Sequence, residues 1–221
     1  MAGAVRLVMA GAVLSVLLGC DRSEVVEDLR TPGAAEAADS VRAVDPANAG
    51  SAGGVDGTAV SMLEHVQVAT AMYDHGQFYL YTNVWDGVDY PGVVDRAIEA
   101  GGIAQDGPLL VVLSSHQCNF AVTLRVEQWS AQPPDDLDDW QEVFAASIDV
   151  DAFGLLYEST TSVQNLRLEA LPGRYAVRIS GRGFVQRGWP GSTTPGDEWR
   201  VQLWPQEGDR QEPARLKAWS G

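Results

Sequence analysis

Histidine and cysteine are the residues in this chain best suited to nucleophilic or metal chemistry, and His116 and Cys118 lie two positions apart. On a β-strand that spacing points both side chains the same way. A cysteine nucleophile needs a base and an electropositive setting, whereas this half of the chain is strongly acidic. A metal site needs three or four ligands, and no second spaced pair exists. We therefore interpret Cys118 as a packed core thiol, and we expect no metal site and no cofactor.

Asp74 and His75 form a second candidate, an acid–base pair placed just before an aromatic segment. The chain contains no nucleophile elbow, P-loop, dinucleotide fingerprint or zinc-protease helix. We therefore assign no catalytic residue and expect a protein that is not an enzyme. One alternative is an envelope hydrolase of unrecognised type, in which His75 or His116 works beside a carboxylate.

The sharpest charge feature is an acidic run within Pro133–Trp140, which contains Asp135, Asp136, Asp138 and Asp139. Such a run can be a solvated loop that prevents edge-to-edge strand pairing. It can also be a protein-binding surface that attracts a basic partner, since charge steers association. A calcium loop is disfavoured because the glycine and terminal glutamate of an EF-hand are missing.

The acidity of the chain is concentrated in one half of its folded part. The formal net charge is −15 overall. Residues 60–151 hold 15 acidic and two basic residues, whereas residues 152–221 hold seven acidic and nine basic ones. This balance argues against nucleic acid or an anionic membrane surface as a direct partner. It fits either solubility or a protein partner with a basic face.

Arginines alternate with apolar residues in one segment of the more basic half. Arg174, Arg178 and Arg182 would share one strand face, and Arg200 would lie beside them on the next strand. They are either a solvent face with acidic cross-strand partners or an anion-binding row, because guanidinium forks match carboxylate and phosphate geometry.

Tryptophans suggest another kind of ligand site. Residues 183–196 form a connection long enough to be functional or irregular, with Phe184 and Trp189 exposed unless they fold back. Trp189, Trp204 and Tyr79 could together bind a cell-wall glycan or another small ligand. This binding module is the main alternative to a protein-binding function.

The N-terminus has the pattern of a bacterial lipoprotein. Arg6 precedes a short apolar run that ends in Leu17-Leu18-Gly19-Cys20, which is typical of an export signal cleaved before a lipidated cysteine. We expect a signal peptide at residues 1–19 and a lipid on Cys20. Residues 20–59 would be a flexible linker, because residues 21–58 are rich in Ala, Gly and Asp and lack aromatics. The expected location is the cell envelope, on the extracytoplasmic side of a membrane whose identity, inner or outer, stays open.

Residues 60–221 predict one all-β domain, a β-sandwich with one short helix. Period-two alternation and apolar runs mark the expected strands, which cover residues 77–82, 108–113, 120–126, 143–148, 155–157, 163–168, 175–179 and 199–203. Asp89-Tyr90-Pro91 begins the helix, and Gly101-Gly102 ends it. Leu171 to Tyr175 has the pattern of a tyrosine corner, in which a buried hydroxyl binds nearby backbone.

Three stretches of the chain match a known pattern, namely Tyr73-Asp74-His75-Gly76-Gln77-Phe78, the stretch from Ala97 to Gly107, and Leu171-Pro172-Gly173-Arg174-Tyr175. They resemble the competence protein ComJ family of nuclease inhibitors. Asp138 to Val143 and Gln202 to Pro205 are similar to small uncharacterised actinobacterial proteins. The resemblance spans about residues 65–205 and implies a β-sandwich that binds and blocks a partner protein. The lipobox and linker depart from that family, so the partner need not be a competence nuclease.

Together these observations predict a membrane-tethered, acidic protein-binding domain. An inhibitor or immunity factor for an exported nuclease or toxin is the specific form that we favour, because nucleases present basic clefts to phosphates.

Overall fold

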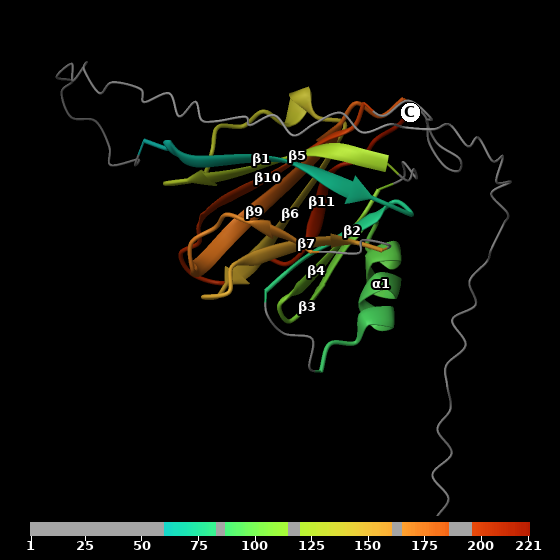
Figure 1. Cartoon of the computed structure of the whole chain (residues 1–221), viewed down its shortest axis with the longest axis horizontal. Coiled ribbons are helices and arrows are strands. Elements are labelled where there is room, and N and C mark those ends of the chain that lie inside the picture. Colours follow the sequence, from blue (N-terminus) through green and yellow to red (C-terminus); the bar gives the residue numbers. More distant parts are fainter. Residues whose placement is uncertain (1–59, 83–86, 115–119, 161–164, 186–195) are drawn as a thin grey trace, which may run out of the picture. The chain divides into compact units, whose positions relative to one another are not determined.

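Two β-sheets stack on each other and enclose the main hydrophobic core (Figure 1). The structure is a computed structural model that describes residues 60–82, 87–114, 120–160, 165–185 and 196–221. The first sheet has the order β1-β5-β10-β9-β6-β11. Its strands are β1 (Leu63–Tyr73), β5 (Phe120–Trp129), β10 (Glu198–Pro205), β9 (Gly173–Arg182), β6 (Glu142–Val150) and β11 (Ala214–Lys217).

The second sheet is smaller and antiparallel throughout, with the order β3-β4-β2-β7-β8. Its strands are β3 (Ile103–Asp106), β4 (Leu109–Leu113), β2 (Gln77–Tyr81), β7 (Leu155–Ser159) and β8 (Leu166–Leu168). The first sheet contains one parallel pair, β5 with β10, whose strands are far apart in sequence. Over the residues that the structure describes, the fold is all-β with one short α-helix, as expected.

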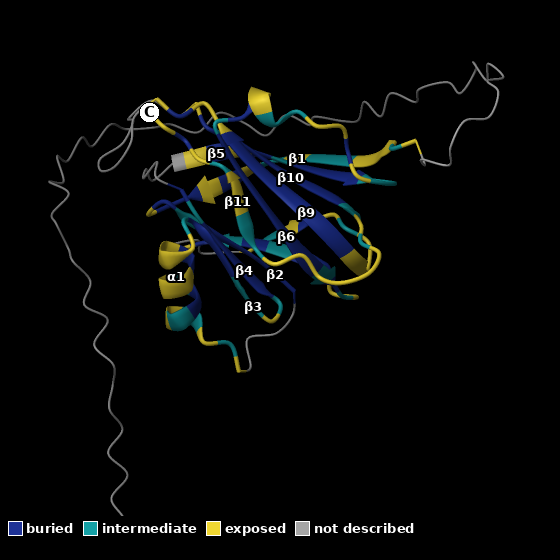
Figure 2. Cartoon of the chain, turned by 180° about the vertical axis from the view of Figure 1, so that it is seen from behind, coloured by how far each residue is buried: buried dark blue, intermediate teal, exposed yellow. Residues whose placement is uncertain are grey.

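Alternation along the strands decides which side chains enter the core. Trp199, Val201 and Leu203 of β10 point inward, while the residues between them lie on the outer face of the first sheet. Phe78 of β2 packs edge-on against Trp199, with ring centroids 5.1 Å apart, so the two sheets share one aromatic core. Figure 2 shows both sheets largely buried.

Helix α1 (Tyr90–Glu99) covers the outer face of the second sheet. The carboxylate of Asp89 caps its first turn by accepting from the Gly92 amide at 3.2 Å. Val93 and Ala97 are buried against that sheet. The helix ends before Gly102, whose φ of 122° suits glycine and where an added Cβ would meet the Leu113 carbonyl oxygen at 2.8 Å.

Three strands were not expected from the sequence, namely β1, β3 and β11. β1 is an edge strand whose residues include Glu64, His65 and Gln67, so its period-two signal is weak. β3 and β11 are four residues long, which is too short for a periodic pattern. Tertiary pairing, rather than local preference, makes these segments strands.

The tyrosine corner expected at Tyr175 is confirmed. The Tyr175 hydroxyl donates to the Leu171 carbonyl oxygen at 2.9 Å and accepts from Gln128 at 2.9 Å. Phe184 also folds back, because it is buried against Trp199 and Trp219. Within the described residues, no helix has the length and apolar character needed to cross a bilayer.

Candidate functional site: a charged sheet face under an acidic loop

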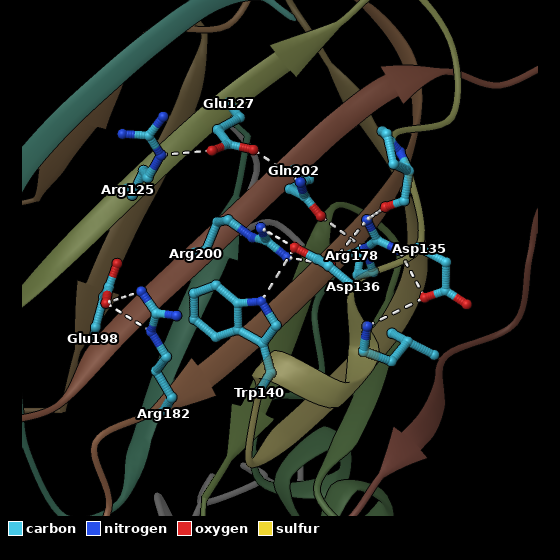
Figure 3. Close-up of polar contacts among 12 residues, drawn as sticks. Arg125, Glu127, Asp135, Asp136, Trp140, Arg178, Arg182, Glu198, Arg200 and Gln202 are labelled. Carbon is cyan, nitrogen blue, oxygen red and sulfur yellow. Dashed lines mark hydrogen bonds and ion pairs between the residues drawn. The ribbon is translucent and has the colours of Figure 1, made fainter. Parts of the chain in front are cut away.

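The outer face of the first sheet carries an unusual concentration of charge. The register of β9 and β10 places Arg178 opposite Gln202 and Arg182 opposite Glu198. The parallel pairing of β10 with β5 then places Arg200 beside Arg125. Three neighbouring strands therefore present guanidinium groups on one face, with their apolar neighbours in the core (Figure 3).

The acidic loop, residues 133–139, lies over this face. Its Asp136 carboxylate accepts two hydrogen bonds from Arg200, at 2.6 and 2.8 Å. Nη2 of Arg178 is 3.5 Å from the same carboxylate and donates to the Pro134 carbonyl oxygen at 2.8 Å. Lys217 of β11 holds the other end of the loop by donating to the Leu137 carbonyl oxygen at 2.9 Å. Cations from three strands thus fix the loop.

Trp140 directly follows the acidic loop and is buried, at 4 % exposure. The guanidinium carbons of Arg200 and Arg182 lie over its ring, at 4.3 and 4.5 Å from the centroid. Its indole N–H faces the Asp136 carboxylate at 3.4 Å. Cation–π attraction to a desolvated ring therefore reinforces the ion pair.

A second branch of the network surrounds Glu127. Its carboxylate accepts from Arg125 at 2.5 Å, from Gln202 at 2.8 Å and from Trp129 at 3.0 Å. Gln202 in turn accepts from Nε of Arg178 at 2.7 Å. The amide of Gln202 therefore connects the Glu127 carboxylate with the Arg178 guanidinium, as the dashed lines of Figure 3 show.

Burial and charge act in opposite directions on the carboxyl groups of the network. Burial would raise the pKa of Asp136, but the hydrogen bonds and positive charge of Arg200, with help from Trp140 and Arg178, lower that pKa below its ordinary value. Burial likewise opposes ionisation of Glu127, and hydrogen bonds from Arg125, Gln202 and Trp129 lower its pKa. Both groups are therefore carboxylates at neutral pH.

The remaining carboxylates of the acidic loop face outward. The Asp135 side chain is 77 % exposed and lies 3.8 Å from Nη1 of Arg178. Asp138 and Asp139 are exposed residues of a 3₁₀ turn, Leu137–Asp139. Among the residues that the structure describes, neither has an ion-pair partner within 4.0 Å. The loop thus combines one fixed carboxylate with three solvent-facing ones.

A cleft of about 260 Å³ opens beside Trp140. Arg125, Arg182 and Arg200 line it together with four carboxylates, those of Glu127, Asp136, Asp139 and Glu198. The Arg182 guanidinium pairs with Glu198 at 2.7 and 2.8 Å. The cleft is therefore a place where charged groups of both signs meet solvent.

The expected arginine row is divided by the structure. Arg178, Arg182 and Arg200 belong to the charged face, whereas Arg174 lies near the start of β9 and pairs with Asp149 at 3.1 Å. Arg178 and Arg200 are buried, with side chains 6 % and 9 % exposed. The acidic loop causes this burial, because outer-face residues of a sheet otherwise meet solvent.

The structure also bears on the alternative ligand site. Tyr79 is buried beneath α1 at 2 % exposure, so its side chain is not available to the glycan-binding site in which it was expected. Trp204 is partly buried and lines a pocket of about 250 Å³ with Asp135, Leu137 and Arg178. Trp189 lies outside the described residues.

Of the candidate residues for catalysis, Asp74 and His75 are described, and they lie between β1 and β2. Nδ1 of His75 lies 2.8 Å from the buried Asp74 carboxylate, and His75 adopts a φ of 53° in the turn between β1 and β2. Cys20, His116 and Cys118 lie outside the described residues. Within the described part of the chain, no group of three potential metal ligands converges.

Sequence reasoning did not single out Trp140, Glu127, Gln202 and Lys217 as members of the site. Trp140 directly follows the acidic run, and that position was the one available signal. Glu127 and Gln202 lie on different strands, and the sequence does not indicate their contact, because it depends on the parallel pairing of β5 with β10.

No protein-family model matches the chain, and no curated protein matches it. Two solved structures are similar. One is ComJ, inhibitor of the DNA degrading activity of NucA, from Bacillus subtilis, at 15% identity and a TM-score of 0.46, covering 67% of this chain and 100% of ComJ. The other is Crocagin biosynthetic gene J, at 16% identity and a TM-score of 0.43, covering 65% of this chain and 100% of that protein. The fold of this chain resembles that of ComJ, and the likeness concerns the fold alone.

Proposed function

We propose that the acidic loop is a preformed binding surface for a basic protein. The observation that carries this proposal is that one carboxylate of the loop is held by arginines while the other three are exposed. Asp136 is held by Arg200 and Arg178, whereas Asp135, Asp138 and Asp139 face solvent. A surface that is already ordered loses less conformational entropy on binding.

The charge of the chain suits such a partner. A net charge of −15 steers a basic protein towards the domain and raises the rate of association. The exposed carboxylates then contact the partner's lysines or arginines, while the ion pair between Arg200 and Asp136 keeps the loop in position. Binding should therefore weaken as salt concentration rises.

The more specific form of the proposal is an inhibitor or immunity factor for an exported nuclease or toxin. A nuclease needs a basic cleft to hold phosphates, and the exposed carboxylates of a loop that is held in place can occupy such a cleft. A lipid on Cys20 would keep the domain at the membrane, where an exported partner passes.

The test uses the full-length chain as bait against envelope and secreted fractions of the producing cell, with elution by rising salt. The test variant carries Asp135→Asn, Asp138→Asn and Asp139→Asn. The matched control carries Glu207→Gln, Asp209→Asn and Glu212→Gln. These three exposed residues follow β10 in the sequence and lie outside the acidic loop. Both variants change the net charge equally, so they separate local contact from total charge.

The expected result is one basic protein that the wild type and the control retain and the test variant releases at lower salt. The dissociation constant should rise at least about tenfold in the test variant, as three lost charge contacts would predict. Equal binding of the test variant and the control would remove the acidic loop from the function.

A further inference from the structure

Arg178 and Arg200 together have the geometry of an oxyanion-binding site. They lie on the neighbouring strands β9 and β10, offset by two positions in register, and both guanidinium groups approach the same carboxylate, that of Asp136. Arg200 grips it with two parallel hydrogen bonds. Paired arginine forks of this kind bind carboxylate and phosphate groups in general.

Asp136 does not use all the donors of this pair. Nε of Arg200 is buried and has no hydrogen-bond partner among the described residues. Nη1 of Arg178 comes no closer than 3.8 Å to Asp135. Since a buried N–H without a partner costs free energy, an occupant with more oxygens than a carboxylate could satisfy this site better.

Asp136 is also an occupant that can leave. It belongs to a loop rather than to the sheet, and its side chain is 28 % exposed. The cleft beside Trp140 gives solvent a route to Arg200 and is lined by two further arginines, Arg125 and Arg182. With Asp136 displaced, the four arginines of this face still outnumber the three other carboxylates that line the cleft, those of Glu127, Asp139 and Glu198.

We propose that Arg178 and Arg200 form an oxyanion site that Asp136 occupies in the resting protein, and that an external phosphate or carboxylate group replaces Asp136 and releases the acidic loop. This inference goes beyond the proposed function, because it concerns an anionic ligand and needs no basic partner. In this proposal the acidic loop covers the two arginines when no anion is bound and moves away from them when an anion binds.

The first experiment titrates the full-length Asp136→Ala variant with sodium phosphate, sodium acetate and sodium chloride at matched ionic strength, and follows thermal unfolding. Asp139→Ala is the matched control, because it removes a carboxylate of the same loop and leaves Asp136 in place. Phosphate or acetate should raise the Tm of the Asp136→Ala variant saturably, by about 3–6 °C at ten times Kd. Chloride should not, and the Asp139→Ala variant should show a smaller gain at the same anion concentration, because its Asp136 competes with the anion.

The two anions distinguish the source of the ligand. A gain with phosphate alone identifies a tetrahedral oxyanion, and a gain with acetate as well identifies any carboxylate or phosphate group. No gain beyond chloride in the folded Asp136→Ala variant overturns the site. If that variant does not fold, Asp136→Ser replaces it, and the readout becomes recovery of the native circular dichroism spectrum in phosphate but not in chloride.

The second experiment tests displacement in the wild-type chain. The indole N–H of Trp140 faces the Asp136 carboxylate, so its NMR signal, assigned by comparison with Trp140→Phe, should shift saturably with phosphate. Chloride at equal ionic strength should leave it in place. An indole signal that phosphate does not move, or moves no more than chloride does, overturns the displacement.

Discussion

Arg200 and Asp136 form a two-pronged ion pair, with nitrogen–oxygen distances of 2.6 and 2.8 Å, that ties β10 to a loop 64 residues earlier in the chain. The pair is mostly desolvated, since the Arg200 side chain is 9 % exposed and that of Asp136 is 28 % exposed. Trp140 lies against both partners. This contact holds the acidic loop in one position and connects the two charge features of the sequence.

Replacing Asp136 with Asn should destabilise the domain by about 1–3 kcal/mol, because Arg178 and Arg200 then remain buried without their counterion. Urea unfolding followed by tryptophan fluorescence measures the change. Asp138→Asn serves as the control, and its exposed position predicts a change within about 0.5 kcal/mol. Equal stability of the two variants would show that the ion pair contributes nothing to the fold.

Acid should weaken the domain through Asp136 and Glu127, whose folded-state pKa values lie below their ordinary values of 3.8 and 4.5. A carboxyl group whose pKa is depressed in the folded state stabilises that state fully above the unfolded pKa and loses this contribution as pH falls through the folded pKa. The free energy of unfolding should therefore drop below about pH 4. Urea titrations from pH 3 to pH 7 test this, and Asp136→Asn should show a shallower drop than the wild type.

Tyr175→Phe should cost about 1–2 kcal/mol, because the Leu171 carbonyl oxygen loses its donor and the Gln128 amide loses its acceptor. Leu171→Ala is a suitable control. Its side chain is 67% exposed, and the substitution keeps the carbonyl that Tyr175 uses. Chemical unfolding of both variants gives the comparison. A loss for Leu171→Ala as large as that for Tyr175→Phe would mean that packing, rather than the hydroxyl, matters at this corner.

Cys20→Ser should release the protein from the membrane fraction, because the lipobox serine cannot accept the thioether-linked lipid. Cys118→Ser removes the other cysteine and should leave membrane association unchanged. Fractionation of cells followed by immunoblotting distinguishes the two. Membrane-bound Cys20→Ser protein would exclude lipidation at this position as the anchor.

Residue patterns were sufficient to predict the structure wherever the contacts that determine it are close in sequence. The alternation in β9 and β10 indicated which residues enter the core and which lie outside. Asp89 and the Gly101-Gly102 pair bounded α1, and the Leu171–Tyr175 pattern marked the tyrosine corner. In each case, one turn of backbone or one strand sets the interaction, so residue types and spacing are enough.

Tertiary structure alone decided that the acidic loop and the arginines belong to one site. From the sequence, Asp136 was a candidate for binding a basic protein, and Arg178 a candidate for binding an anion. Their contact requires β9 and β10 to pair, β10 to run parallel to β5, and the loop before β6 to fold back over that face. Charge attraction between groups distant in sequence has no local signature, because its strength depends on separation and burial that only the folded chain defines.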